Sequence, residues 1–237
     1  MHSFSLASLK IDSTWIQFNL PVPGPNIFHD RLVTQNLCRS LVLPLVQKSL
    51  LEDFQIDPGH YMLEKKESGA PTLALRPGLK ESLKHPPLSI SISHSGPYIG
   101  IFLSDEEPVG LDLEDLSRQR SWGKLVQRFN KIDQDWIKKK GMKGFYQLWT
   151  GREALGKSLE KGLETALGLN IISWPSASGV WHPIEVNINP QPSEKKIKTK
   201  LFSILFNQKE DIFYSLVLAS NPSEKNVPQT LRSHFYL

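Results

Sequence analysis

The stretch Val109–Glu114, VGLDLE, decides the predicted fold because its apolar and acidic residues alternate. A period of two is typical of a β-strand, in which successive side chains point to opposite faces. Leu111 and Leu113 would then enter the core. Asp112 and Glu114 would leave from the other face, with Cα atoms about 6.6 Å apart. Two interpretations stay open for this pair: a solvated acidic face, or two carboxylates that share a cation.

Further strands and helices are predicted on both sides of this stretch. The alternation and spacing of apolar residues predict a helix over residues 28–50 that kinks or ends at Pro44, a turn and short strand within 69–78, strands at 88–95 and 98–104, a helical region over 122–160, a strand at 184–190, and a terminal hairpin of 201–207 and 212–220. These elements form two sets along the chain, and in each set the helix comes before the strands. The predicted class is therefore α+β, with two similar halves, 1–105 and 106–237, the second carrying the acidic pair.

The composition describes an ordinary globular chain of 237 residues, 39% hydrophobic and 22% charged. With a single cysteine, Cys38, no internal disulfide can form, and a reducing, cytoplasmic setting is expected. No secretory signal and no membrane-spanning apolar run is visible, so we expect a soluble protein. The net charge of +4 favours acidic partners, and the lysine clusters at 138–140 and 194–200 are interpreted as solvated faces rather than nucleic-acid sites.

The stretch Leu148–Lys157, LWTGREALGK, places an acid and a base one helical turn apart. Glu153 and Lys157 are either a surface ion pair or two groups aimed at a substrate. Glu153 lies one turn from Trp149, which marks the buried face of this helix. It is the obvious third acid for a hard cation, and oxygen ligands favour Mg²⁺ over Zn²⁺.

A histidine completes the candidate chemistry in SISHSG, residues 91–96. His94 ends an alternating strand next to Ser93. A histidine in such a place can donate a hydrogen bond to a phosphate, although a lone histidine is more often a structural residue.

Three motifs in order resemble the phosphopantetheinyl transferases of the surfactin-synthetase-activating type. That family shows Ser-His-Ser, then Gly-(Ile/Val)-Asp-(Ile/Leu)-Glu, then Trp-(Ser/Thr)-x-Lys-Glu-(Ala/Ser)-x-x-Lys. The corresponding residues here are 93–95, 110–114 and 149–157, and the sequence KGL at 161–163 matches the continuation of the third motif. The resemblance covers about residues 88–163.

The resemblance implies two pseudo-symmetric α+β halves with coenzyme A, the co-substrate, and Mg²⁺ in the cleft between them. The implied reaction moves 4′-phosphopantetheine from coenzyme A to a serine of an acyl or peptidyl carrier protein and releases adenosine 3′,5′-bisphosphate. It implies that Asp112, Glu114 and Glu153 bind the metal. Lys157 and His94 would stabilise the phosphate charge, and Glu153 or a metal-bound water would be the base.

The remaining coenzyme A contacts are less directly implied. Arg152 stands where the family has lysine, keeps the positive charge and is counted with Ser93 among the binding residues. The Gly-Lys-Pro of the family is here Gly69-Ala70-Pro71, so Lys65 or Lys66 is a candidate for the 3′-phosphate. Arg31 and Arg39 are candidates for the basic residues that the family carries on its first long helix, and surface charge is the alternative for both. The alternative is a degenerate relative that binds coenzyme A or a carrier protein without catalysis; a nucleic-acid-binding module is a third hypothesis. The length favours a monomer, and no membrane partner is expected.

Overall fold

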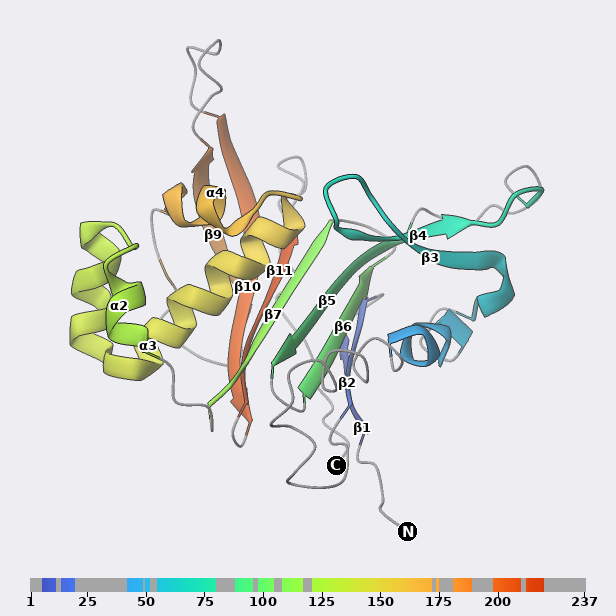
Figure 1. The fold of residues 1–237 in the computed structure, drawn as a ribbon, viewed down its shortest axis with the longest axis horizontal. Helices are drawn as coiled ribbons and strands as arrows, with labels where there is room; N and C mark the ends of the chain where they lie inside the picture. The colour runs from blue at the N-terminus through green and yellow to red at the C-terminus, as the bar shows by residue number, and fades with distance from the viewer. Residues whose placement is uncertain are drawn as a thin grey trace. The chain divides into compact units, whose positions relative to one another are not determined.

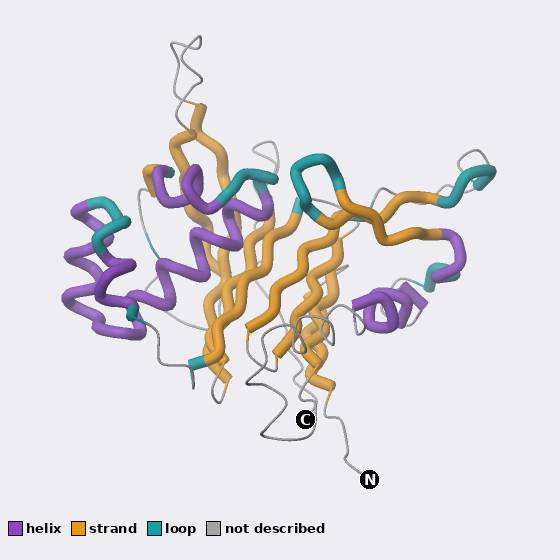
Figure 2. Tube along the Cα trace, viewed as in Figure 1, coloured by secondary structure: helices purple, strands orange, loops and turns teal. Residues whose placement is uncertain are grey.

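The computed structural model describes residues 6–11, 14–19, 42–48, 50–51, 55–79, 88–95, 98–104, 108–116, 121–171, 174, 181–188, 198–209 and 212–219. Figures 1 and 2 show helices and strands in both parts of the chain. The chain divides into two compact units at the bond between Pro108 and Val109. None of the described helices is both long and apolar enough to cross a lipid bilayer.

The N-terminal unit contains an antiparallel sheet with strand order β1-β2-β6-β5. Its strands are β1 (Leu6–Ile11), β2 (Thr14–Asn19), β5 (Ser89–Ser95) and β6 (Tyr98–Ser104). A separate hairpin joins β3 (Tyr61–Lys65) to β4 (Pro71–Leu75) and follows a 3-10 turn, η2 (Pro58–His60). The helical residues 42–48 and 50–51, the hairpin and the β5–β6 pair bury one apolar cluster, which includes Val46, Leu50, Tyr61, Leu73, Ile90 and Ile101.

The C-terminal unit packs helices on an antiparallel sheet with strand order β7-β11-β10-β9-β8. Its elements are β7 (Val109–Asp115), α2 (Trp122–Val126), α3 (Lys131–Ser158), α4 (Leu163–Gly168), β8 (Asn170–Ile171), β9 (Trp181–Ile188), β10 (Lys198–Lys209) and β11 (Ile212–Ala219). The long helix α3 crosses the face of this sheet (Figure 1).

Helix α3 has a capped start and a break in its middle. Its N-cap, Asn130, accepts a hydrogen bond from the backbone N–H of Asp133 at 2.9 Å, which satisfies one of the free donors of the first turn. Gly141 interrupts the helix with φ 65° and ψ −147°, a conformation open to glycine because it lacks a Cβ. The kink separates an exposed first part of the helix from a second part that is largely buried.

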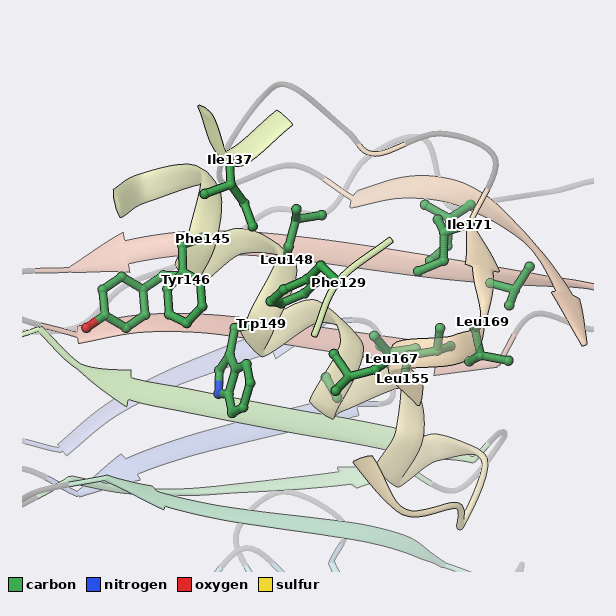
Figure 3. Packing of buried hydrophobic residues seen from close by; sticks show 14 residues of the cluster. Phe129, Ile137, Phe145, Tyr146, Leu148, Trp149, Leu155, Leu167, Leu169 and Ile171 are labelled. Atoms are coloured by element: carbon green, nitrogen blue, oxygen red, sulfur yellow. The ribbon is translucent and has the colours of Figure 1, made fainter. Parts of the chain in front are cut away.

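The second part of α3 supplies most of the core of this unit. Figure 3 shows the aromatic side chains that it presents, Phe145, Tyr146 and Trp149, next to Phe129. The rings of Phe145 and Trp149 are stacked with centroids 5.8 Å apart, and Phe129 meets Phe145 edge-on at 6.1 Å. Packing of this kind fixes the height and rotation of the helix above the sheet.

The predicted mixed α+β class is confirmed, as are the strands β5, β6, β7 and β9 and the terminal hairpin β10–β11. One part of the prediction was wrong. Strands β1 and β2 precede the helix in the N-terminal half, so helix does not come first there. Residues 42–48, with Pro44 among them, are helical, so the predicted helix does not end at Pro44. Residues 28–41 of that helix are outside the described residues, and a kink at Pro44 stays a prediction.

Candidate active site

Strand β7 carries its acids on a covered face. All seven residues of the strand are buried, including Asp112 and Glu114. Gly110 shares their face by the alternation of the strand, and a Cβ at Gly110 would lie 1.8 Å from the carbonyl oxygen of Ala154 on α3. Glycine therefore lets the helix approach the strand directly over the two acids. The interpretation as a solvated acidic face is wrong, because α3 lies on that face.

Glu114 is held by the aromatic core. The indole Nε1 of Trp149 donates a hydrogen bond to Glu114 Oε1 at 3.1 Å, in a buried setting. Since Trp149 is stacked on Phe145, this donor is fixed in place. The carboxylate of Glu114 is thus oriented by a residue whose own position is set by packing.

Lys157 reaches across from α3 to the strand. Its ammonium donates to Asp112 Oδ1 at 2.8 Å and to the backbone carbonyl of Leu111 at 2.9 Å. The lysine side chain is 33% exposed and the aspartate side chain 5%. The interpretation of Glu153 and Lys157 as a surface ion pair is wrong, because the lysine pairs with an acid of the neighbouring strand.

Glu153 faces the same acids. Burial and the negative charge of Asp112 raise the pKa of Glu153 from its ordinary value of 4.5 to about 8; Lys157 opposes this, and Glu114 and a hydrogen bond with Asp112 add to it. A carboxyl group with this pKa holds a proton at neutral pH. The structure therefore brings Asp112, Glu114, Glu153 and Lys157 together at one place between β7 and α3.

The donor set suits a hard divalent cation. Three neighbouring carboxylates, of which Glu153 stays protonated because of burial and the charge of the other two, form the kind of acidic cluster that a cation would stabilise, and oxygen ligands match Mg²⁺. In the form described here, the charge is balanced by Lys157 on Asp112 and by the raised pKa of Glu153. Within the described ranges, no three His, Cys, Asp or Glu side chains are arranged as a ready-made metal shell. Magnesium binding therefore stays a prediction.

Arg152 requires a correction, because it points away from this site. Its side chain is 0% exposed, and Nη2 donates to the equally buried Asp133. Nη1 donates to the backbone carbonyls of the α4 end, at 2.8 Å to Ala166, 3.2 Å to Leu167 and 2.9 Å to Leu169. The prediction that Arg152 binds coenzyme A is wrong, since its guanidinium is used inside the protein to join α3 to α4.

The other predicted binding residues belong to the N-terminal unit. His94 is exposed near the end of β5 and lies opposite Ile99 of β6, while Ser93 is buried. Lys65 is exposed at the end of β3, and Arg31 lies outside the described residues. The roles of these four residues in coenzyme A binding stay predictions.

Sequence reasoning missed two residues that hold helix α3 in place. Asp133 anchors Arg152, and Ser215 on β11 shares a buried hydrogen bond of 2.5 Å with Thr150 of α3. Ser215 is also the register partner of Asp112. A signal existed for Ser215, which is a polar residue inside the apolar run IFYSLVLA, but none pointed to Asp133 beyond its place in the first turn of a helix.

Comparison with known proteins bears on this region. Residues 108–210 match the sequence model of the family described as the 4′-phosphopantetheinyl transferase superfamily. A stretch of 82 residues is 37% identical to a protein of Synechocystis sp. (strain ATCC 27184 / PCC 6803 / Kazusa) named "Putative 4'-phosphopantetheinyl transferase", and it covers 32% of this chain. The chain spans about a third of the length of that curated relative, 33%. The part of the chain that carries Asp112, Glu114, Glu153 and Lys157 is therefore similar to the 4′-phosphopantetheinyl transferase superfamily.

Proposed function

We propose that this protein is a magnesium-dependent phosphopantetheinyl transferase of the surfactin-synthetase-activating type. It would move 4′-phosphopantetheine from coenzyme A to a serine of an acyl or peptidyl carrier protein and release adenosine 3′,5′-bisphosphate. The observation that carries the proposal is the convergence of three carboxylates and a lysine between β7 and α3, inside the residues that match the superfamily.

The chemistry of the reaction explains why these groups are needed together. The serine Oγ forms a bond to the β-phosphorus of coenzyme A, the bond from that phosphorus to the leaving bisphosphate breaks, and the serine proton passes to a base. Phosphoryl transfer depends mainly on positioning and on stabilising charge at the phosphate oxygens. Asp112, Glu114 and Glu153 would hold Mg²⁺, which when bound would neutralise part of the charge on those oxygens.

Glu153 is the proposed base, alone or through a water. It can accept the serine proton only as a carboxylate, and its pKa of about 8 leaves it protonated below that pH. A cation among the three acids would lower this pKa by attraction to the charged form. The acidic cluster therefore makes the base dependent on a bound cation.

Lys157 is the proposed donor to the phosphate. Its side chain is partly exposed, so its ammonium can turn from Asp112 toward an anion without leaving a buried position. His94, Ser93, Lys65 and Arg31 are proposed as further contacts to coenzyme A.

Several wider features are proposed with the activity. The halves 1–105 and 106–237 are proposed to be pseudo-symmetric, with the active site in a cleft between them. A monomeric state is proposed as well. A cytoplasmic location is proposed because the chain has a single cysteine.

Intact-mass spectrometry of a carrier protein, incubated with coenzyme A and Mg²⁺, tests the proposal. We expect the wild-type chain to add the mass of one phosphopantetheine and Glu153→Ala to add none. Glu185→Gln, a change of an exposed acid on β9, should modify the carrier as fast as the wild type. Full modification by Glu153→Ala would remove Glu153 from the mechanism. Coenzyme A binding without any mass change by the wild-type chain would support the degenerate alternative.

A further inference from the structure

Two buried hydroxyl groups join helix α3 to the sheet beside the candidate active site. Oγ of Ser215 on β11 lies 2.5 Å from Oγ1 of Thr150 on α3, and both residues are fully buried. Thr150 Oγ1 also donates to the carbonyl oxygen of Tyr146, one turn earlier in the helix, at 2.8 Å. Because a hydroxyl has a single hydrogen to donate, the hydrogen between the two oxygens comes from Ser215. The two groups therefore form one directed bond from strand to helix.

Both ends of this bond are next to residues of the candidate site. Ser215 is the register partner of Asp112 in the antiparallel pair of β11 and β7, so their side chains lie side by side on one face of the sheet. Thr150 comes three residues before Glu153 on α3, so the two side chains occupy neighbouring positions on the helix. The bond thus links the helical turn that carries one carboxyl group to the strand position beside another.

The contact between α3 and β7 has few features that would stop the helix from sliding. Gly110 meets the backbone of Ala154, and glycine has no side chain to interlock with a helix. The bonds from Trp149 to Glu114 and from Lys157 to Asp112 also cross from helix to strand. Each of those two bonds ends on a proposed cation ligand, whose partners would change when the cation binds. The bond between Ser215 and Thr150 contains no charged group and would persist through the reaction.

We propose that Ser215 and Thr150 are positioning residues that fix helix α3 on the sheet, so that Glu153 stays beside the carboxylates of Asp112 and Glu114; this rests on the proposed function. A hydrogen bond has a defined length and direction, whereas an apolar contact between smooth surfaces permits small shifts. Ser215 interrupts the apolar run IFYSLVLA, in which an apolar residue would fill the core without the cost of burying a hydroxyl. A fixed position of the helix is the compensating gain.

Loss of the bond should displace the acids by a small distance while the fold remains. Removal of one hydroxyl leaves the other buried without that partner, and α3 can then shift on the sheet. A displacement of about 1 Å can slow an enzyme by about 10²-fold. Loss of a group that orients metal ligands typically lowers metal affinity or activity by about 10- to 100-fold. The effect is therefore expected in the chemical step and in cation binding.

Steady-state kinetics with an apo acyl carrier protein, coenzyme A and Mg²⁺ test the positioning role. We expect Ser215→Ala and Thr150→Val each to lower kcat about tenfold or more and to change the KM for coenzyme A less than about threefold. The double variant should be within about twofold of the slower single variant, because one bond is lost in each case. Thr150→Ser keeps the hydroxyl and should return kcat to within about threefold of the wild type.

Ser158→Ala is the matched control. It removes another buried hydroxyl from α3, but this one donates to the carbonyl oxygen of Leu155 inside the same helix, at 2.9 Å. Its kcat should stay within about twofold of the wild type. Circular dichroism at the assay temperature shows that each variant is folded. A loss of kcat in Ser158→Ala equal to that in Ser215→Ala would show that any buried hydroxyl of the helix layer matters, and would overturn the positioning role.

Titration calorimetry with Mg²⁺, without and with coenzyme A, separates this inference from the proposed function. Mg²⁺ binding about tenfold weaker in Ser215→Ala and Thr150→Val than in the wild type and Ser158→Ala would support the positioning role even if no phosphopantetheine were transferred. Wild-type kcat and Mg²⁺ affinity in the folded variants would overturn the positioning role and leave the proposed function intact. A wild-type chain that neither binds Mg²⁺ nor modifies the carrier would overturn both.

Discussion

Two ion pairs on helix α3 differ in how far solvent reaches them, and this difference decides their roles. Arg152–Asp133 is closed off from solvent, with both side chains at most 3% exposed, and Nη1 of the arginine donates to carbonyl groups at the end of α4. Lys157–Asp112, one turn further along, leaves a third of the lysine exposed and sits among other acids. The first pair can only hold the fold, whereas the second can exchange its partner for a ligand. The role of a basic residue in a motif therefore follows from its surroundings in the fold and not from its charge alone.

The largest effect on stability is expected from breaking the closed pair. Arg152→Met leaves Asp133 charged and buried without its partner, which should lower the free energy of unfolding by about 3–5 kcal/mol. Urea denaturation measures this. Arg128→Met removes a more exposed arginine that pairs with Glu164 and is the matched control, with an expected loss of about 0–1 kcal/mol.

A second variant tests whether the buried charge causes that loss. Arg152→Met combined with Asp133→Leu replaces both ions by apolar groups and should be more stable than Arg152→Met alone. A double variant as unstable as the single one would show that the hydrogen bonds to α4 matter more than the ion pair.

A side chain at Gly110, where strand β7 and helix α3 approach closely, should have an intermediate effect on the free energy of unfolding. In Gly110→Ala the new Cβ would meet the carbonyl oxygen of Ala154, a backbone atom that can yield only if α3 moves. We expect a loss of about 1–3 kcal/mol, as for other overpacked cores, together with slower transfer because Lys157 and Asp112 move apart.

Gly123→Ala provides the control, since nothing lies within 4 Å of a Cβ at this position of α2. It should be neutral or more stable by up to about 1 kcal/mol, as alanine is the better helix former. If both alanine variants unfolded at the same urea concentration, the close approach at Gly110 would be unimportant.

The open pair should contribute less to stability than the closed pair and more to activity. Lys157→Met leaves the buried Asp112 without its lysine and is expected to lower the free energy of unfolding by about 1–3 kcal/mol, less than Arg152→Met because the lysine side of this pair is partly exposed to solvent. Transfer to the carrier should fall about 10²-fold, as for the loss of one charge-stabilising donor. Lys157→Arg keeps the charge and should recover part of the rate. A Lys157→Met protein with normal transfer would exclude the lysine from the phosphate site.

The sequence could predict the local parts of this arrangement and not the distant ones. The alternation in VGLDLE and the apolar spacing around Trp149 were enough to place β7 and the second part of α3. Arg152 and Asp133 are nineteen residues apart, about 28 Å on a straight helix, so their contact requires the break at Gly141. Neither residue carries a local signal of that fold-back. Strands β1 and β2 were missed for a related reason, since β1 pairs with β2, and β2 joins the sheet only through its long-range pairing with β6.

A pH-dependent effect is expected from the proton on Glu153. Its pKa is about 8 in the folded protein and near 4.5 when exposed, so between these values the folded state binds more protons than the unfolded state. The free energy of unfolding should therefore fall as pH rises from about 4.5 to about 8, in protein kept metal-free with a chelator. Glu153→Gln cannot lose a proton and should show a flatter profile, while Glu185→Gln should keep the wild-type slope. Mg²⁺ should reduce the wild-type slope, since a cation would lower the pKa of Glu153. Parallel profiles for the wild type and Glu153→Gln would mean that neither burial nor the charges of Asp112 and Glu114 raise the pKa of this carboxyl group, and the case for an acidic cluster at the candidate active site would lose its main support.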